Sequence, residues 1–439
     1  MAAAPRAAAP TRIEELRPFY DEVAKCGKCG FCQPACPVYR ATSIESHVAR
    51  GKNALFRNLI EGRTVMDEQL TEAFENCLLC RACTANCFSA VKTDRLVVAF
   101  RESYARRFGR PWVQRWIFRN LLPSPGRMAC VIRLAWAARR LGLVDAANRL
   151  GLLAMINPKL PKALALRDEV PAGFLRDRLR TTVPTPPQPR LRVGYWISCG
   201  FNYMLPEVGE ATVRELTRQG AAVTVLKNAC CGLPVYGYGD LEGARALARR
   251  NIDSLGDLDR FDFVVSECGS CSGHLKEYPG LLAGDPEYSV RAARLVRKVR
   301  AFTELLVELV GVDPADLQPV EAVVTYHDPC HMTERYQGVV SQPREIIRAV
   351  PGVDFRELNE ADACCGAAGS YTVMHNDISM KILERKTGNV EHTGAGILIT
   401  ECPACIMQLA LGARRRGLDI EVLSVSQLLE RARREQGGA

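Results

Sequence analysis

Eighteen of the nineteen cysteines in this 439-residue sequence fall into four groups whose spacing suits metal binding. The first two groups share the pattern C-x2-C-x2-C-x3-C, in "CGKCGFCQPACP" and "CLLCRACTANCF". Their members are Cys26, Cys29, Cys32 and Cys36 in the first run, and Cys77, Cys80, Cys83 and Cys87 in the second. This spacing is typical of [4Fe–4S] clusters. The sequence therefore predicts two such cubes near its N-terminus.

The same spacing indicates how the thiolates are shared. Three closely spaced cysteines bind one cube, and the fourth crosses to the other. We therefore expect two ligand sets: Cys26, Cys29, Cys32 and Cys87, and Cys77, Cys80, Cys83 and Cys36. Phe88 follows the second run where this motif prefers proline, which affects a turn and not a ligand. Structural zinc is the alternative, but it usually takes paired C-x2-C hooks, four thiolates in all.

The other ten cysteines form an internal repeat. The first copy has Cys199, Cys230, Cys231, Cys268 and Cys271; the second has Cys330, Cys364, Cys365, Cys402 and Cys405. In each copy the next cysteine lies 37 positions after the second cysteine of the adjacent pair. Such self-similarity indicates one supersecondary unit used twice.

The elements around these cysteines predict how they meet. Short β-branched runs such as "LRVGYWISC", "FDFVVSEC", "AVVTYHDPC" and "AGILITEC" each end in a cysteine, and helical stretches lie between them. This alternation predicts parallel α/β units, in which the carboxyl ends of the strands share one edge. The five cysteines of each copy should converge there. Gly232 and Gly366 follow the two adjacent pairs and permit the tight turn that would splay both thiols around one cluster.

The first half has a different character. The segment between the two cysteine runs contains "MDEQLTEAFENCLLC", which looks helical, so an α-helical ferredoxin domain is expected there. We predict a disordered tail over 1–20, the ferredoxin domain over 21–100, a basic helical connector with a proline-rich linker over 101–190, and two repeats over 191–315 and 316–439.

The C…CCG…C-x2-C motif, present twice, resembles the CCG-domain family, which includes the catalytic subunit of heterodisulfide reductase. With two ferredoxin-type runs in front, residues 21–429 resemble the iron–sulfur subunit of glycolate oxidase, lactate-utilisation proteins and the anchor subunit of anaerobic glycerol-3-phosphate dehydrogenase. Stretches such as "YHDPCHM", "CCGAAGSYTVMHNDIS" and "TECPACIMQL" carry the resemblance. It implies one or two further, noncubane [4Fe–4S] clusters in the CCG domain. The family's Arg-Gly-Arg appears here as Arg50-Gly51-Lys52.

Composition and charge narrow the setting. Apolar residues make up 47% and charged residues 24%, as in ordinary soluble proteins, and no run approaches the roughly 18 apolar residues that a spanning helix needs. With no secretory h-region, the thiols indicate a reduced, cytoplasmic protein. The net charge of +9 is carried by residues 101–150. That basic face suits peripheral contact with the inner face of the membrane, packing on the protein's own core, or a partner subunit, and not nucleic acid.

Four residues outside the cysteine groups are of interest. His327 and His331 flank Cys330, and His274 follows Cys271; each suits either a hydrogen bond to a cluster sulfur or a turn or capping role. Cys130 belongs to no group and is expected to pack as a small hydrophobe.

These features predict an electron carrier. No G-x-G-x-x-G follows a strand and no nucleophile–base pair is visible, so the chain itself is not expected to bind NAD or flavin. The resemblance implies an iron–sulfur subunit that accepts electrons from a flavoprotein dehydrogenase oxidising a 2-hydroxy acid, glycolate or lactate, and passes them to quinone or another carrier. The complete cysteine sets keep open a heterodisulfide-reductase-like activity. A zinc-stabilised scaffold is a third, remote hypothesis.

Overall fold

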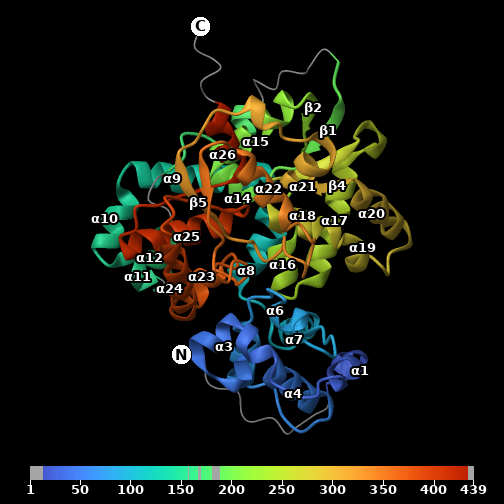
Figure 1. Ribbon diagram of the computed structural model, residues 1–439. Coiled ribbons are helices and arrows are strands. Elements are labelled where there is room, and N and C mark those ends of the chain that lie inside the picture. Colours follow the sequence, from blue (N-terminus) through green and yellow to red (C-terminus); the bar gives the residue numbers. More distant parts are fainter. Residues whose placement is uncertain (1–12, 157, 167–169, 180–187, 434–439) are drawn as a thin grey trace.

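The computed structural model describes residues 13–156, 158–166, 170–179 and 188–433. Figure 1 shows a smaller helical unit below a larger α/β unit. The smaller unit contains these elements: η1 (Glu14–Phe19), α1 (Tyr20–Ala24), α2 (Cys32–Ala35), α3 (Pro37–Thr42), η2 (Glu45–His47), α4 (Ala49–Ile60), α5 (Glu68–Glu75), α6 (Ala82–Ala85) and α7 (Thr93–Phe108). The first half is therefore the α-helical ferredoxin domain that the sequence predicted.

An aromatic core holds these helices in place. Phe56, Phe74 and Phe100, from α4, α5 and α7, are fully buried, and the rings of Phe74 and Phe100 stack with centroids 3.9 Å apart. The Asp67 side chain caps α5 by accepting a hydrogen bond from the Leu70 N–H at 2.8 Å. Because α5 ends just before Cys77, this packing positions the second cysteine run.

The ordered chain begins before the boundary that the sequence suggested. Residues 1–12 of the expected tail lie outside the described residues, but residues 14–19 form η1. Leu16 of this helix is buried in the ferredoxin core, which explains why the segment is ordered. Similarly, α7 continues past residue 100 to Phe108 without interruption.

The connector is also helical. It contains α8 (Trp112–Trp116), η3 (Ile117–Leu121), α9 (Pro125–Arg140), α10 (Leu143–Arg149), α11 (Leu152–Ile156), α12 (Leu160–Leu164) and α13 (Leu175–Arg178). Phe118 and Leu121 are buried against the first CCG repeat, whereas α9 and α10 have no buried residue. The connector is thus attached through η3 and through α13, whose Leu175 is buried in the core of the larger unit, and it leaves α9 and α10 on the surface.

The larger unit holds two four-stranded parallel sheets. The first comprises β1 (Leu191–Tyr195), β2 (Ala221–Val225), β3 (Phe263–Ser266) and β4 (Val299–Ala301), in the order β2-β1-β3-β4. The second comprises β5 (Ala322–Tyr326), β6 (Val353–Phe355), β7 (Ile397–Ile399) and β8 (Glu421–Leu423), in the order β6-β5-β7-β8. The equivalent strand orders confirm a duplicated α/β domain.

Helices cover both sheets. In the first repeat they are α14 (Cys199–Tyr203), α15 (Pro206–Arg218), α16 (Leu233–Gly237), α17 (Leu241–Leu255), η5 (Leu258–Arg260), α18 (Gly269–Lys276), α19 (Tyr278–Leu281), α20 (Pro286–Lys298), α21 (Phe302–Leu305) and η6 (Leu306–Val310). In the second they are η7 (Pro314–Asp316), α22 (Ser341–Ala349), α23 (Tyr371–Met374), α24 (Asn376–Thr393), α25 (Pro403–Arg416) and α26 (Val425–Arg433).

The two repeats share one hydrophobic core. Side chains from both sheets, such as Val193 and Tyr195 of β1 and Val324 and Tyr326 of β5, belong to a single buried cluster. The two sheets are therefore fixed relative to each other, and so are the loops at their strand ends. Among the described residues, no helix is long and apolar enough to cross a membrane.

Candidate metal centres

The strand ends deliver the cysteines as the βαβ pattern predicted. Cys199 and Cys268 follow β1 and β3, and Cys330 and Cys402 occupy the same places after β5 and β7. Cys268 and Cys402 are the N-cap residues of α18 and α25, whose first turns carry Cys271 and Cys405. The equivalent sheets thus bring equivalent thiols to equivalent loops.

Within each repeat, the five thiols form a chain of contacts. In the first repeat the chain runs Cys199–Cys230–Cys231–Cys271–Cys268. In the second it runs Cys330–Cys364–Cys365–Cys405–Cys402. The thiols of Cys268 and Cys402 also contact each other, so the ten cysteines make one continuous series across both repeats.

These thiols suit a metal centre. Eight of the ten are buried, and none of the chain's nineteen cysteines forms a disulfide. Contact with the Cys231 thiol, followed by burial, raises the pKa of Cys271, and Cys405 beside Cys365 behaves in the same way. So many buried thiols become stable thiolates only where metal ions supply compensating positive charge.

The turn after each adjacent pair is the expected one. Gly232 and Gly366 have φ values of +96° and +87°, in the left-handed region that side chains avoid. A Cβ atom on Gly366 would lie 2.8 Å from the Ser379 carbonyl oxygen. Glycine is therefore required to let both cysteines of the pair face the same centre.

The ferredoxin cysteines separate into a surface set and an interior set. The surface set, expected to be Cys26, Cys29, Cys32 and Cys87, contains the exposed Cys29, and the interior set, expected to be Cys36, Cys77, Cys80 and Cys83, contains the buried Cys80. The other six cysteines are half-buried. Beside them, the rings of Phe31 and Phe88 pack edge to face with centroids 4.7 Å apart, and 53% and 82% of these side chains are exposed. This end of the molecule is open to solvent.

The interior set includes Cys36, one of the two cysteines that were expected to cross between runs. The thiol of Cys83 interacts with those of Cys77, Cys80 and Cys36, so Cys36 lies with the second run. Burial raises the pKa of Cys80 and of Cys83.

A buried lysine lies beside these thiols. Lys52, 2% exposed, donates a hydrogen bond to the His47 carbonyl. Burial lowers its pKa, an effect that the thiols of Cys77 and Cys36 oppose. A cation held here offsets the negative charge of an interior thiolate set.

Interactions between thiols of neighbouring sets indicate that the four cysteine sets follow one another in a linear order. Cys32 of the surface set interacts with Cys36 of the interior set, Cys80 of the interior set with Cys330, and Cys402 with Cys268. A hydrophobic cluster with Val38, Leu78 and Tyr371 surrounds the junction of Cys80 with Cys364. The order is therefore surface set, interior set, second CCG repeat, first CCG repeat.

Arg81, between Cys80 and Cys83, ties the ferredoxin domain to both repeats. Its guanidinium pairs with Asp94 at 2.8 Å and with Glu277 of the first repeat, and lies 3.8 Å from the ring centroid of Tyr336 in the second. The Tyr336 hydroxyl donates to the Leu79 carbonyl at 2.5 Å. Burial alone would raise the pKa of Glu277, but His274 and Arg81 lower it to about 2.

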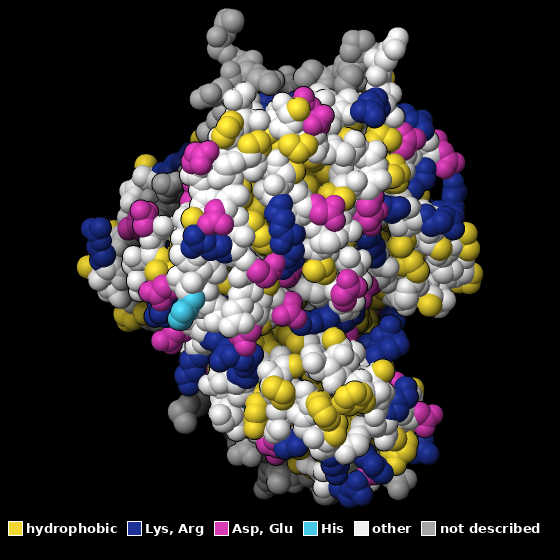
Figure 2. Space-filling view, viewed as in Figure 1, with side chains coloured by type: hydrophobic (Ala, Val, Ile, Leu, Met, Phe, Trp, Pro, Cys, Tyr) yellow, Lys and Arg dark blue, Asp and Glu magenta, His cyan; other side chains and the backbone are white. Residues whose placement is uncertain are grey.

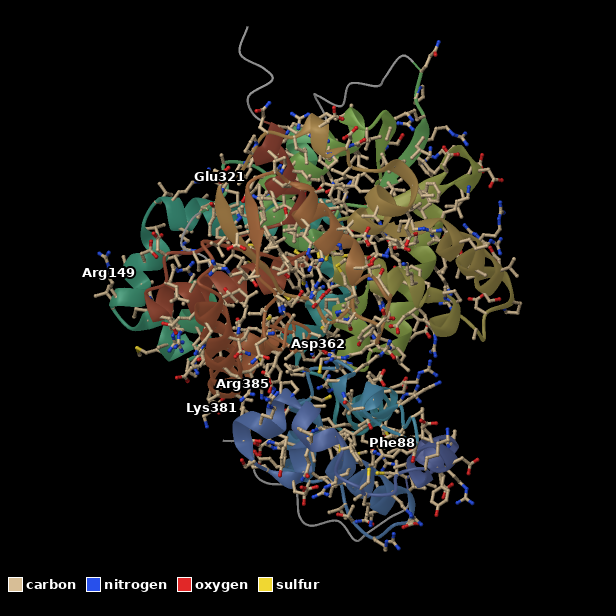
Figure 3. All side chains as sticks on the ribbon, in the orientation of Figure 1. Phe88, Arg149, Glu321, Asp362, Lys381 and Arg385 are labelled. Carbon is tan, nitrogen blue, oxygen red and sulfur yellow. The ribbon has the colours of Figure 1, made fainter. Side chains whose placement is uncertain are left out.

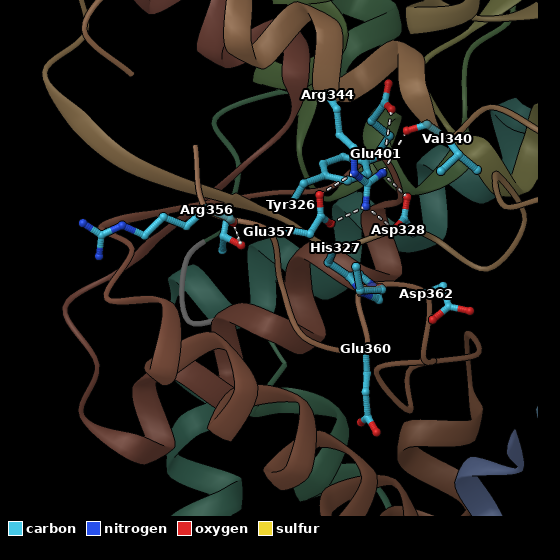
Figure 4. A network of polar contacts seen from close by, with 12 residues as sticks. Tyr326, His327, Asp328, Val340, Arg344, Arg356, Glu357, Glu360, Asp362 and Glu401 are labelled. Atoms are coloured by element: carbon cyan, nitrogen blue, oxygen red, sulfur yellow. Dashed lines mark hydrogen bonds and ion pairs between the residues drawn. The ribbon is translucent and has the colours of Figure 1, made fainter. Parts of the chain in front are cut away.

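Figure 4 shows the polar network behind the second repeat's loop. The Asp328 carboxylate accepts two hydrogen bonds from Arg344, at 2.8 and 2.7 Å, and Arg344 also binds Glu357. The Tyr326 hydroxyl donates to Glu401 at 3.1 Å, and burial raises the pKa of Glu401 to about 8. These bonds fix the backbone on either side of His327.

His274 and His327 are buried and His331 is half-buried, and their surroundings differ. The Nδ1 atom of His331 lies 3.6 Å from the Cys330 sulfur. The His274 ring packs against Tyr236 and Tyr278, and its Nδ1 atom lies 3.8 Å from Glu277. Cys130, expected to pack inside, is exposed because α9 lies on the surface.

Sequence reasoning missed Arg81 and Arg344, and it named Lys52 only as the departure in Arg50-Gly51-Lys52, without its burial beside the thiols. Arg81 sits inside the second motif, so its position could have drawn attention to it. Nothing local distinguishes Arg344, whose role depends on Asp328 and Glu357 from other elements.

Three family descriptions match the chain. Residues 22–91 match a "4Fe-4S dicluster domain", residues 109–166 match "Glycolate oxidase iron-sulfur subunit, linker region", and residues 193–276 and 324–410 match a "Cysteine-rich domain".

Relatives with the same domains are similar over long stretches. The "Probable glycolate oxidase iron-sulfur subunit" of Bacillus subtilis (strain 168) is 32% identical over 412 residues, 92% of each chain. "Lactate utilization protein A" of Oceanobacillus iheyensis is 34% identical over 250 residues, which cover 56% of this chain and 99% of that protein. A hypothetical protein from Helicobacter pylori of known structure is 12% identical, covers 64% of this chain and 57% of its own, and gives a TM-score of 0.42.

Proposed function

The chain belongs to the family of glycolate oxidase iron–sulfur subunits, and from this we propose that it is the electron-transfer subunit of a flavin-dependent 2-hydroxyacid dehydrogenase. Glycolate or lactate is the proposed substrate of the flavoprotein partner, in keeping with the names of the relatives. The observation that carries the proposal is the linear order of four thiol sets, in which a thiol of each set interacts electrostatically with a thiol of the next. Such a series suits electron conduction, and the series itself includes no group other than the clustered thiols that would react with a substrate.

The proposal assigns the clusters as follows. One [4Fe–4S] cube takes Cys26, Cys29, Cys32 and Cys87, a second takes Cys77, Cys80, Cys83 and Cys36, and each complete CCG set takes a noncubane [4Fe–4S] cluster. Bound clusters supply one-electron redox chemistry. The protein's residues hold the clusters in sequence, exclude water from the interior ones and balance their charge. The domain division belongs to the same proposal, with the first boundary moved from residue 20 to before η1, the second moved from residue 100 to the end of α7 at Phe108, and the others kept at residues 190 and 315.

Electrons would enter at the surface set. The exposed Phe31 and Phe88 side chains, with Lys28 and Lys92 nearby in the sequence and also exposed, suit a small apolar contact with a charged rim. Electron-transfer complexes use interfaces of this modest kind. Figure 2 shows hydrophobic side chains on the surface of the smaller unit, where Figure 3 labels Phe88. We assign this face to the flavoprotein partner.

The connector is the proposed contact with the membrane that holds a quinone acceptor. Large apolar side chains are exposed along it, among them Trp112 (74%), Leu141 (74%), Leu150 (73%) and Met155 (82%). The same helices carry arginines, including Arg149 (Figure 3). Apolar side chains beside arginines suit the interface of an anionic bilayer. The proposed location is the cytoplasm, peripheral to the inner membrane face.

One observation favours a second function, heterodisulfide-reductase-like reduction of a disulfide. A cavity of about 250 Å³ lies beside Cys364, and its lining includes Arg40, Lys381 and Arg385. Figure 3 shows Lys381 and Arg385 near the boundary of the two units. The basic side chains that line this cavity would suit a small anionic disulfide, bound next to the metal centre of the second repeat.

An experiment on the complex, purified anaerobically with its partners, distinguishes these functions. Possible electron donors and one acceptor are added one at a time. Glycolate, each lactate enantiomer, glycerol 3-phosphate and a small disulfide are added, and the visible iron–sulfur absorption is followed. The proposal predicts that one 2-hydroxy acid bleaches the clusters. The reductase would be favoured instead if neither the hydroxy acids nor glycerol 3-phosphate bleached the clusters and the disulfide reoxidised a pre-reduced sample. Zinc without acid-labile sulfide would favour the scaffold.

A further inference from the structure

We propose that His327 supplies a nitrogen ligand to the metal centre of the second CCG repeat, a ligand that the first repeat lacks at the equivalent position. The inference concerns this chain's own residues and rests on the proposed iron–sulfur function.

The position of the His327 ring carries the proposal. The side chain is 1% exposed, and one of its ring nitrogens lies with the sulfurs of Cys365 and Cys405 in a group whose members are all within 4.8 Å of one another. Among the described residues, this is the one set in which a histidine joins two of the clustered thiols so closely. A single metal atom can contact three donors at such separations.

Hydrogen bonding identifies the nitrogen that faces the thiols. Nδ1 lies 3.1 Å from the Ala361 carbonyl oxygen, which can only accept, so Nδ1 carries the proton. In neutral imidazole this leaves Nε2 with a free lone pair. Nε2 is buried and makes no hydrogen bond of ordinary geometry among the described residues, and the ring interacts with the neighbouring Cys365 thiol.

This arrangement is the usual one for a metal-bound histidine. Such a histidine donates its other ring N–H to a carbonyl or carboxylate, which fixes the tautomer and aims the ligand nitrogen. An orphaned nitrogen in a buried site is otherwise costly. A hydrogen bond from the ring to a cluster sulfur, the role suggested by the sequence, would need a second proton on Nε2.

The backbone around His327 is held firmly enough to aim the ring. The His327 N–H donates to the Ile399 carbonyl at 2.9 Å, and the Asp328 N–H donates to the Ala361 carbonyl at 3.1 Å. The Asp328–Arg344 pair and the Tyr326–Glu401 bond lock the neighbouring side chains (Figure 4). The ring therefore does not depend on a mobile loop for its orientation.

The first repeat differs at this position. Trp196 follows β1 as His327 follows β5. The backbone N–H of Trp196 donates to the Val265 carbonyl at 2.8 Å, which corresponds to the bond from His327 to Ile399 in the second repeat. The indole packs among Cys231, Cys268 and Cys271 and offers no lone pair to a metal. The two sites thus have equivalent sets of five thiols, but the second site has a sixth donor, the His327 nitrogen, that the first site lacks.

Pulsed electron paramagnetic resonance on the anaerobically purified complex tests the proposal. Wild-type protein is prepared with ordinary histidine and with ¹⁵N-histidine, and the signal of the second repeat's centre is recorded. Strong coupling to a histidine nitrogen that changes with the label is expected. His327→Gln should abolish this coupling and shift the midpoint potential of that centre alone. His392→Gln, an exposed histidine on α24, is the matched control and should change neither.

Several outcomes would overturn the proposal. Absence of strong histidine coupling in labelled wild-type protein would do so without any variant, and a weak coupling would indicate only a hydrogen bond to sulfur. Coupling that persists in His327→Gln would assign the ligand elsewhere. If that variant does not fold, His331→Gln and His274→Gln are examined instead, and loss of the coupling in either one contradicts the assignment. Bleaching by a hydroxy acid in the same samples tests the proposed function separately.

Discussion

At the scale of single residues, the adjacent cysteine pairs explain most about this protein. Cys230 with Cys231, and Cys364 with Cys365, lie at the middle of two equivalent thiol chains, and each pair contacts thiols on both sides. A glycine with positive φ follows each pair and makes this geometry accessible. The pair is therefore built to share one metal centre rather than to bond to itself.

Changing Cys365 to serine tests this account. Removing the central thiol of the second chain should release the iron of that CCG centre and leave about twelve irons, about eight in the ferredoxin cubes and about four in the first CCG centre. Iron and acid-labile sulfide analysis, with electron paramagnetic resonance of the cubes, measures the result. Cys130→Ser, which changes the exposed cysteine outside every group, should lose no iron. Disappearance of the cube signals in Cys365→Ser would show that the two halves do not hold their clusters independently.

The sequence predicted these residues well because metal ligation depends on residue type and spacing. Both cysteine runs, both CCG sets and the glycine turns follow from short patterns. Arg344 and Lys52 could not be found in this way, since their value depends on burial beside residues from other elements. The fate of Cys130 was mispredicted because an apolar-looking helix stays on the surface when nothing in the chain covers it.

At the scale of elements, the junction around Arg81 decides whether the two halves stay in contact. The Arg81 side chain is 16% exposed and pairs with two carboxylates from different domains. Its aromatic partner, Tyr336, comes from the second repeat.

Arg81→Met should therefore loosen the ferredoxin unit. Removing one partner from a largely buried ion pair costs about 3 kcal/mol, because the remaining charge is left unpaired. Urea unfolding of the holoprotein, followed through the cluster absorption, measures the loss. Arg107→Met removes an exposed pair with Glu15 and should cost less than about 1 kcal/mol. Equal effects of the two variants would argue against a special role for the junction.

The connector helices make a second prediction at this scale. Wild-type protein should bind vesicles containing anionic lipid, and Leu141→Ser with Leu150→Ser should weaken binding about tenfold or more, since each leucine buries apolar surface. Co-sedimentation measures this binding. The control, Val290→Ser on α20, changes a 62% exposed side chain away from the connector. Binding unaffected by the leucine changes would instead favour a protein partner for this face.

The sequence predicted the elements of this half only in outline. Helices and basic charge were evident, but three uses of the apolar face fitted the same pattern. Part of this face does pack on the protein's own core, because Phe118 and Leu121 of η3 are buried, whereas α9 has no buried residue. Whether a membrane or a partner subunit covers the exposed face is decided by molecules outside this chain.

At the scale of the whole molecule, the proposed order of the four thiol sets would give electrons one route. The surface set is exposed beside Phe31 and Phe88, and the other sets lie progressively further along the chain of contacts. The shared core of the two sheets keeps the last two sets at a fixed separation. The molecule is therefore organised as an entry surface followed by an interior path.

Phe88→Ser tests the entry surface. Loss of this ring should raise the KM for the flavoprotein partner about tenfold, because an exposed aromatic anchor contributes apolar burial on docking. The midpoint potentials of the clusters should not change. Phe108→Ser, which alters a 53% exposed ring at the end of α7, serves as the control. An unchanged KM in Phe88→Ser would move the docking site elsewhere.

The most direct test of the central claim is to ask whether electrons from the substrate pass through this chain. The anaerobic complex is mixed with excess 2-hydroxy acid, and flavin absorption and the iron–sulfur resonance signals are recorded together. We predict that both cubes become reduced along with the flavin and are reoxidised when quinone is added. Clusters that remain oxidised beside a fully reduced flavin would contradict the account.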